Sequence, residues 1–520
     1  MANWSRPHQE ALLLCTVVEL VQSQEIEARP EQFLYLRWTQ GRMHLLRFRR
    51  YLPYWMSSHV TAGRSLLAVA VLAGIALRFY RPDAASMTAD EGAAWAAAAE
   101  PVRRLLQLQP QLDAGKLAIY DLLLHYWIEM FGDSLRSMRG LSSAIDIVSI
   151  LLMFVVVREL YRVFADGELQ TGELAGGFAA LMFATNVAVV QSARTARMYP
   201  LMTAAELAQL FFFVRAQRHG GLLNCISAAV FLALAIAANF TAVFLLVGEG
   251  LWVAYLLVAR WKRWPGEQLR AAGPALSLTA GIALLLPFAP AAVAVSRAAI
   301  ADGALDWIRY QPPLAWSYDL LRGDTGNRSL FRLFLALAAF GLWRHWSWAP
   351  LIPMFMAVAA AGPFVAVAML SLFGRPMMVD RYVLLALIAF LGLAATGAAT
   401  FESIPGRLLV FVVIVWLSVR ALGHSSGFWI DWKRAVAIAC AESPANAGIS
   451  VVPSYAVNVV RYHLPPERRL LAVGVDSRCG DSRILIVSPG RPIGPAQIAE
   501  LKACYPRLLG QATRVEVRSR

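Results

Sequence analysis

The sequence predicts a mainly α-helical polytopic membrane protein with a small α/β domain at its C-terminal end. Of its 520 residues, 58% are hydrophobic and only 16% are charged, which is too apolar for a soluble protein of this length. Lys and Arg are concentrated in short loops between apolar runs and in the two terminal segments. The net charge of +14 is therefore attributed to basic residues that set the membrane topology and contact lipid headgroups. No nucleic acid partner is predicted.

Residues 1–58 form a polar and basic segment before the first apolar run. Its end, "GRMHLLRFRRYLPYW", interleaves arginines with aromatic residues, and such a segment is suited to lie on an anionic membrane surface. An ordinary cytoplasmic flank of the first span is an equally good interpretation. Both interpretations place the N-terminus in the cytoplasm.

Residues 59–422 contain about eleven apolar runs, each long enough to cross a bilayer. The runs lie near residues 61–80, 141–158, 174–191, 199–215, 222–238, 240–258, 272–293, 329–344, 349–372, 382–401 and 406–422. Counted from a cytoplasmic N-terminus, they place the Arg- and Lys-rich loops inside, as the positive-inside rule requires. The same count places three loops, residues 81–140, 294–328 and 371–381, on the periplasmic side of a bacterial inner membrane.

Residues 423–520 are predicted to form a periplasmic α/β domain. Four short runs are β-like, namely "AGISVVPS", "LLAVGVD", "SRILIVSPG" and "TRVEVRS". Two further segments, "DWKRAVAIACA" and "PAQIAELKACY", have helical spacing. Cys440, Cys479 and Cys504 all lie in this tail. In an oxidising compartment we expect one pair of them to be joined and the third to stay free.

Between the first two spans, the segments "DEGAAWAAAAEPVRRLLQLQ" and "KLAIYDLLLHYWIEMFG" have helical spacing. Both carry polar residues that a membrane span would avoid. We expect two helices that lie in the outer interface and form a roof over the membrane part.

Acids, cations and aromatic residues recur on this outer side, in segments far apart along the chain. The candidates are Asp90, Glu91, Lys116, Arg194, Arg197, Tyr199, Trp307, Tyr310, Arg381 and Tyr382. Each has an ordinary structural explanation: acids cap helices, arginines at span ends reach the headgroups, and tyrosines form interfacial belts. Their gathering on one side favours a functional site.

Such a set suits transfer from a lipid-linked phosphate. Lys116, Arg194, Arg197 and Arg381 are candidates to hold the phosphate and to stabilise its negative charge as the sugar–oxygen bond breaks. A carboxylate is the natural base for the incoming acceptor, so Asp90 and Glu91 are predicted to be the catalytic pair, with Asp90 facing the acceptor and Glu91 or its neighbours positioning it. The aromatic residues Tyr199, Tyr382, Trp307 and Tyr310 are candidates for binding substrate or closing the site.

Four motifs, in this order and spacing over about residues 60–400, resemble the GT-C glycosyltransferases. They are "TADEGAAW", "GKLAIYDLLLHYWIEMFGDSLRSMR", "QSARTARMYPL" and "VDRYVLL", and the closest branch contains the protein O-mannosyltransferases and the lipid A aminoarabinose transferases. The resemblance implies an inverting transferase with a polyprenyl-phosphate sugar donor and a periplasmic active site. It also implies that Asp90 is the catalytic acid of its pair, that Lys116 binds the donor phosphate, and that Arg197 and Tyr199 belong to the site.

The chain departs from this pattern at two places. Leu117 and Ala118 stand where many relatives have two prolines, and Arg194-Thr195-Ala196-Arg197 stands where many have Gln-Glu-Ala-Arg. The sugar and the acceptor, whether lipid, glycan or protein, stay open. No metal site is predicted, although a divalent cation stays possible.

Two other classes of protein remain as alternatives. A transporter or flippase of a lipid-linked glycan would carry ionisable residues near span centres and repeated broken helices, whereas the candidates here gather on one side. A scaffold with a degenerate catalytic core would explain the absence of an acid at Thr195.

Overall fold

A computed structural model gives the structure of the chain and divides it into two units, Met1–Ser58 and His59–Arg520. The described residues are 33–39, 42–48, 53–165, 168–219, 221–260, 265–301, 308, 310, 312, 326–374, 376–379, 382, 384–401, 403–424, 430–475, 482–488 and 495–519. Trp307 and Arg381 lie outside these residues.

The first unit contains a β-hairpin. Strands β1 (Phe33–Thr39) and β2 (Arg42–Phe48) pair in antiparallel fashion, with Phe33 opposite Phe48. The Phe, Tyr and Trp residues of this stretch favour strands. The prediction for residues 1–58 used their basic charge and not this strand propensity.

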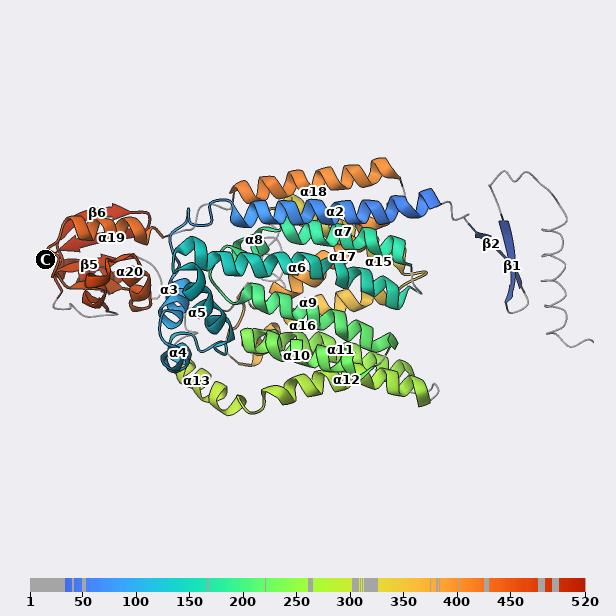
Figure 1. Cartoon of the computed structure of the whole chain (residues 1–520), viewed down its shortest axis with the longest axis horizontal. Helices are drawn as coiled ribbons and strands as arrows, with labels where there is room; N and C mark the ends of the chain where they lie inside the picture. The colour runs from blue at the N-terminus through green and yellow to red at the C-terminus, as the bar shows by residue number, and fades with distance from the viewer. Residues whose placement is uncertain are drawn as a thin grey trace, which may run out of the picture. The chain divides into compact units, whose positions relative to one another are not determined.

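The second unit is dominated by long helices that run alongside one another (Figure 1). They are α2 (Pro53–Phe79), α6 (Leu135–Phe164), α7 (Leu169–Thr185), α8 (Val187–Ala193), α9 (Tyr199–His219), α10 (Leu222–Ala238), η1 (Phe240–Phe244), α11 (Leu245–Arg260), α12 (Pro265–Leu285), α13 (Ala289–Ala301), α15 (Arg328–His345), α16 (Leu351–Phe373), α17 (Leu384–Ala399) and α18 (Ile404–His424). Every apolar run of the sequence falls on a helix or on two consecutive helices.

Five of the described helices are long and apolar enough to cross a membrane, or seven if each of two bent pairs is one span. The bends are 62° between α7 and α8 and 71° between α12 and α13. Asn186 sits at the first bend, where its side chain accepts a hydrogen bond from Val189 N at 3.2 Å and so begins α8. The chain is a mainly α multi-pass membrane protein, and the count of about eleven spans stays a prediction.

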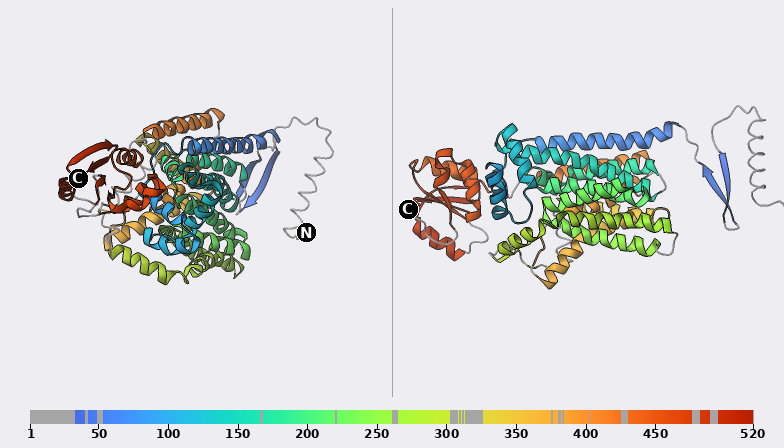
Figure 2. Two further views of the ribbon diagram at one scale, coloured as in Figure 1. Left: turned by 60° about the vertical axis from the view of Figure 1, so that its left-hand side comes forward. Right: turned by 60° about the horizontal axis from the view of Figure 1, so that its bottom comes forward.

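Three short helices follow α2, at the end of the long helices nearest the C-terminal sheet (Figure 2). They are α3 (Ala89–Ala98), α4 (Val102–Leu112) and α5 (Ile119–Phe131). The prediction of a single helix over residues 90–109 is wrong, because the chain breaks before Pro101, which has no N–H to continue the helical ladder. The second predicted helix is α5.

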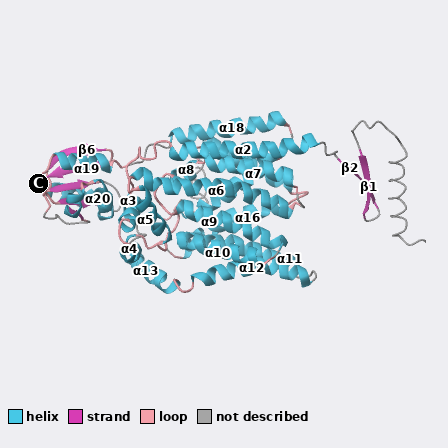
Figure 3. Ribbon diagram, in the orientation of Figure 1, coloured by secondary structure: helices cyan, strands magenta, loops and turns pink. Residues whose placement is uncertain are grey.

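The C-terminal part is an α/β sheet structure, and strands among the described residues occur only there and in the hairpin (Figure 3). Its elements are α19 (Trp432–Ala441), β3 (Ile449–Val452), η3 (Ser454–Ala456), α20 (Val457–His463), η4 (Pro466–Leu471), β4 (Ala472–Gly474), β5 (Ile484–Val487), α21 (Pro495–Cys504), β6 (Arg507–Ala512) and β7 (Val515–Ser519). The strand order is β4-β3-β5-β7-β6. Strand β3 is parallel to β4 and β5, and β7 is antiparallel to β5 and β6. Cys504 is in a disulfide and Cys440 is free.

Helix α3 packs directly on α20 of this C-terminal part. A Cβ atom added to Gly92 would lie 2.8 Å from Val459 Cγ2 and 2.9 Å from Val459 N. Beside this contact, Trp95 meets the Tyr462 ring edge-on, with 5.2 Å between ring centroids, and Arg469 lies over Trp95 at 5.2 Å. The C-terminal sheet structure therefore supports the helix that carries the two predicted catalytic acids.

Candidate active site

The first turn of α3 gives Asp90 and Glu91 different environments. Thr88 caps the helix: its hydroxyl accepts a hydrogen bond from Glu91 N at 3.2 Å, and Glu91 Oε2 accepts one from Thr88 N at 2.8 Å. This capping box turns Glu91 back toward the helix start. The Asp90 side chain points outward and is 51% exposed.

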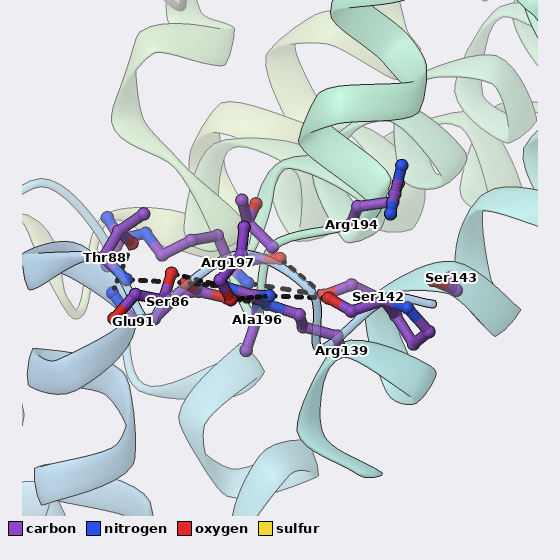
Figure 4. Close-up of polar contacts among 12 residues, drawn as sticks. Ser86, Thr88, Glu91, Arg139, Ser142, Ser143, Arg194, Ala196 and Arg197 are labelled. Carbon is purple, nitrogen blue, oxygen red and sulfur yellow. Dashed lines mark hydrogen bonds and ion pairs between the residues drawn. The ribbon is translucent and has the colours of Figure 1, made fainter. Parts of the chain in front are cut away.

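Glu91 is fully buried, and both of its oxygens are occupied (Figure 4). Arg139 of α6 donates from Nε to Oε1 at 2.7 Å and from Nη2 to Oε2 at 2.8 Å. Ala196 N also donates to Oε1, at 2.8 Å. Glu91 thus joins α3, α6 and the loop after α8, and this is a positioning role.

Hydroxyl groups of α6 fix the loop of residues 194–197 (Figure 4). Ser142 Oγ donates to Arg197 O at 3.1 Å and lies 3.3 Å from Arg197 N, while Ser143 Oγ donates to Ala193 O at 3.1 Å. The Tyr120 hydroxyl lies 2.8 Å from Ser142 Oγ. These bonds hold the backbone of Arg197 and direct its side chain toward α3.

Arg197 contacts two acids from different segments. Its Nη1 donates to Asp90 O at 3.0 Å, and its Nη2 lies 4.0 Å from Asp90 Oδ2 and 2.8 Å from Asp113 Oδ2. Its guanidinium also lies 5.9 Å from the centre of the Tyr199 ring. Nε of this buried side chain has no hydrogen-bond partner among the described residues.

The loop that carries Lys116 is fixed to α4 and to the start of η1. Gln109 Nε2 donates to Asp113 O at 2.7 Å, and Phe240 N donates to Gly115 O at 2.9 Å. Lys116 Nζ, which is buried, lies 2.9 Å from Asp121 and 3.6 Å from Asp113.

These contacts form one chain of alternating charges, which we call the charge cluster: Asp90, Arg197, Asp113, Lys116 and Asp121. The structure therefore brings together the predicted residues Asp90, Lys116 and Arg197, with Tyr199 beside them. Asp113 and Asp121 were not predicted, although both acids flank Lys116 in "LDAGKLAIYD". That flanking is the signal that would have found them.

The pKa values of the cluster follow from burial and from the opposite charges. Burial alone would raise the pKa of Asp113, but Arg197 and Lys116 outweigh it and hold the pKa below its usual value. For Asp121, burial prevails over Lys116 and the pKa is raised. Burial would lower the pKa of Arg197, yet Asp113 and Asp90 raise it. Asp113 is thus the anion that holds both cations in place.

Several predicted residues do not join the cluster. Arg194, at the end of α8, donates from Nη2 to Tyr80 O at 3.2 Å and to Arg81 O at 3.1 Å, and it points away from Glu91 and Arg139 (Figure 4). The turn between the two arginines sends their side chains in different directions. Tyr382 packs near Phe244, and Tyr310 is exposed.

The described residues offer no donor set for a divalent cation. No group of three or more His, Cys, Asp and Glu side chains among them is placed to hold a metal ion. In the charge cluster a cation separates each acid from the next, which opposes a shared metal.

The arrangement of helices is shared with solved structures of membrane proteins. No protein-family model matches the chain, and no curated protein matches it. The structure of ArnT from Cupriavidus metallidurans bound to undecaprenyl phosphate has a TM-score of 0.53 and 13% identity, covering 89% of this chain and 98% of that one. Its apo state gives 0.54 and 13%, with 87% and 97% covered.

A third similar structure is the archaeal oligosaccharyltransferase AglB from Archaeoglobus fulgidus, in complex with an inhibitory peptide and a dolichol-phosphate. Its TM-score is 0.51 at 10% identity, with 84% of this chain and 69% of that one covered. The chain thus shares the fold of these structures over most of its length. At these identities the likeness concerns the fold.

Proposed function

We propose that the chain is an integral membrane glycosyltransferase. It transfers a sugar from a polyprenyl-phosphate-linked donor to an acceptor on the periplasmic side, with inversion. The observation that carries this proposal is the half-exposed carboxylate of Asp90 at the open end of a cluster that also contains Lys116 and Arg197. The shared fold supports it, since the similar structures include ArnT with undecaprenyl phosphate and AglB with a dolichol-phosphate.

Asp90 acts as the general base in this proposal. Its side chain is exposed enough to meet an acceptor, while Arg197 Nη1 fixes its backbone carbonyl. The acceptor hydroxyl or amine gives its proton to Asp90 and forms a bond to the anomeric carbon. The bond from that carbon to the phosphate oxygen breaks on the opposite face, and the electron pair leaves with the polyprenyl phosphate.

Lys116 and Arg197 hold the leaving phosphate. The acids beside Lys116 and Arg197 do not occupy all of the N–H donors of these two cations, because Arg has five N–H groups and Lys has three. Arg197 Nε in particular has no partner among the described residues. Positive charge at the departing phosphate oxygen stabilises the negative charge that develops on it. No general acid is therefore required for the leaving group. Arg381, Trp307, Tyr310 and Tyr382 stay candidates for donor or acceptor contacts.

The proposed topology follows from the same chemistry. Residues 59–422 form the catalytic membrane domain, with the charge cluster and residues 423–520 in the periplasm and the N-terminus in the cytoplasm. The disulfide at Cys504 supports this orientation, because disulfides persist in oxidising compartments.

Transfer of label from a short-chain prenyl-phosphate sugar into membrane acceptors tests the proposal. We expect Asp90→Asn to lower the rate by about a hundredfold or more, the usual effect of removing a general base, with the melting temperature unchanged. Glu100→Gln, at the other end of α3, is the matched control and should keep the wild-type rate. An Asp90→Asn variant that transfers at the wild-type rate contradicts the proposal.

One observation keeps a transporter or flippase as the second candidate. Glu206 and Gln209 of α9 and Glu249 of α11 are buried, and several of their side-chain oxygens have no partner among the described residues. Ionisable residues inside spans often mark a transport pathway. If this candidate is correct, Glu206→Gln will abolish movement of a fluorescent lipid-linked glycan across proteoliposomes, and Asp90→Asn will not.

A further inference from the structure

A cavity of about 810 Å³ lies outside the charge cluster. Its walls come from residues 82–86, the start of α6, the end of α8, the start of α19 and the end of α20. Asp90, Lys116 and Arg197 do not line it. Its volume is typical of a ligand site, and the proposed transfer reaction leaves it without a role.

The floor of the cavity meets the ends of two candidate membrane spans. Leu77 of α2 and Leu422 of α18 both line it, and they lie within the candidate spans Val60–Phe79 and Ile404–Gly423. Leu72 of α2 and Val419 of α18 are exposed apolar side chains within one or two helical turns of these residues. An acyl chain that leaves the cavity along either helix would therefore meet an apolar surface.

The walls of the cavity carry an excess of positive charge. Arg136 is paired with Asp83 at 3.4 Å, and Arg139 is paired with Glu91. Arg194 and Lys433 also line the cavity, and neither forms an ion pair with a carboxylate of the described part of the chain. Asp431 lines the cavity as well, so four cations face the three carboxylates of Asp83, Asp431 and Glu91, and an excess of positive charge remains.

The environment of each cation supports this conclusion. Among the described residues, the Arg194 guanidinium donates to the neutral carbonyls of Tyr80 and Arg81, and burial together with the positive charge of Arg139 lowers the pKa of Arg194. Lys433 is held at the cavity by its backbone N, which donates to Ser86 Oγ at 3.3 Å. The acid nearest in sequence, Asp431, is occupied with capping α19, where it accepts a hydrogen bond from Arg434 N at 3.0 Å.

His463 adds an uncharged polar group to the same wall. It lines the cavity, and its buried Nε2 has no hydrogen-bond partner among the described residues. Burial, followed by the charge of Lys433, lowers its pKa to about 4. At neutral pH the imidazole is therefore uncharged, and it can donate one hydrogen bond without adding to the charge.

We propose that this cavity binds the phosphate headgroup of a membrane lipid. Arg194 and Lys433 contact the phosphate oxygens, His463 Nε2 donates a hydrogen bond, and the acyl chains lie along α2 and α18. Phosphate matches two cations and a neutral donor, and the apolar floor favours a lipid over a soluble anion. The inference does not depend on the proposed transfer, because it concerns binding at residues that the reaction does not use.

Native mass spectrometry of the detergent-purified full chain tests this site. The probes are phosphatidylglycerol, which is anionic, and phosphatidylcholine, which has the same chains but no net charge. We expect Arg194→Gln and Lys433→Gln each to weaken phosphatidylglycerol binding roughly fivefold, and the double variant about thirtyfold, with phosphatidylcholine unaffected. Arg507→Gln, on β6, removes the same charge outside the cavity and should bind as the wild type does.

Two results would overturn the inference. The first is wild-type binding of phosphatidylglycerol by the double variant. The second is displacement of the lipid by an equal concentration of inorganic phosphate, which would assign the cavity to a soluble anion. If Arg194→Gln fails to fold, because Arg194 also holds the Tyr80 and Arg81 carbonyls, the exposed Lys433 still gives a decisive variant.

Discussion

Asp90 and Glu91 are neighbours in the sequence, but the helix gives them different roles. One residue along an α-helix rotates the side-chain direction by about 100°. The capping box turns Glu91 inward onto Arg139, and Asp90 is left facing outward beside Arg197. The sequence predicted the two acids as a catalytic pair in which Asp90 is the base and Glu91 or its neighbours position it, and we propose that Glu91 does so by fixing the helix that carries Asp90.

The Glu91–Arg139 pair gives the first prediction. Arg139→Met leaves Glu91 as a buried carboxylate without its partner, so we expect the free energy of unfolding to fall by about 3–5 kcal/mol. Arg136→Met is the matched control, because it breaks an exposed pair with Asp83 and should cost about 1 kcal/mol or less. Thermal unfolding in detergent measures both, and similar losses in the two variants would contradict the assigned role.

Lys116 is less suitable than Asp90 for a first activity test. Lys116→Ala would leave the buried acids Asp113 and Asp121 without a shared cation, and we expect it to destabilise the loop as well as the donor site. A loss of transfer in this variant would therefore combine a folding effect with a binding effect.

The sequence predicted helices and strands best where the pattern that marks them is local. Apolar runs and helical spacing identified the long helices and α5, and β-like runs identified β3, β4, β5 and β7. Helix α20, "VNVVRYH", was missed because it is short and rich in Val, which favours strands. Helix α20 packs against α3, and a local sequence pattern cannot predict such tertiary packing.

The same limit explains what the sequence left out of the candidate site. It placed Asp90, Lys116 and Arg197 on one side of the membrane by counting spans. It did not identify Arg139 as the partner of Glu91, because the two are 48 residues apart and meet only after α3 has packed on α6. The different directions of Arg194 and Arg197 likewise depend on bonds from Ser142 and Ser143 to the loop.

The contact between α3 and α20 gives a prediction whose sign is diagnostic. Helix propensity alone would make Gly92→Ala stabilising by about 1 kcal/mol, but the added Cβ would lie 2.9 Å from Val459 N. Because this backbone atom cannot move freely, we expect destabilisation and faster proteolysis of residues 430–519.

Gly250→Ala in α11 is the control for this substitution, since a Cβ there meets nothing within 4 Å. It should be neutral or slightly stabilising in the same unfolding and proteolysis experiments. An equal gain of stability in both variants would mean that α3 does not rest on the C-terminal sheet structure.

At the scale of the whole chain, a helical membrane fold carries a candidate site assembled from three distant segments. Helix α3 supplies Asp90, the loop between α4 and α5 supplies Asp113 and Lys116, and the loop after α8 supplies Arg197. The long helices and the C-terminal part hold these segments together. In the proposed reaction, the base faces the acceptor and the buried cations face the donor phosphate.

Because the base and the cations have separate roles, donor binding and sugar transfer should respond differently to substitution. Measuring both in the same variants is the most direct test of the proposed reaction. Undecaprenyl phosphate binding and sugar transfer would be measured for wild type, Asp90→Asn and Arg197→Gln, each with its melting temperature. We expect Asp90→Asn to bind with wild-type affinity but transfer about a hundredfold more slowly or worse, and Arg197→Gln to lose about tenfold or more in affinity. Wild-type transfer by folded Asp90→Asn, or wild-type binding by folded Arg197→Gln, would contradict the account.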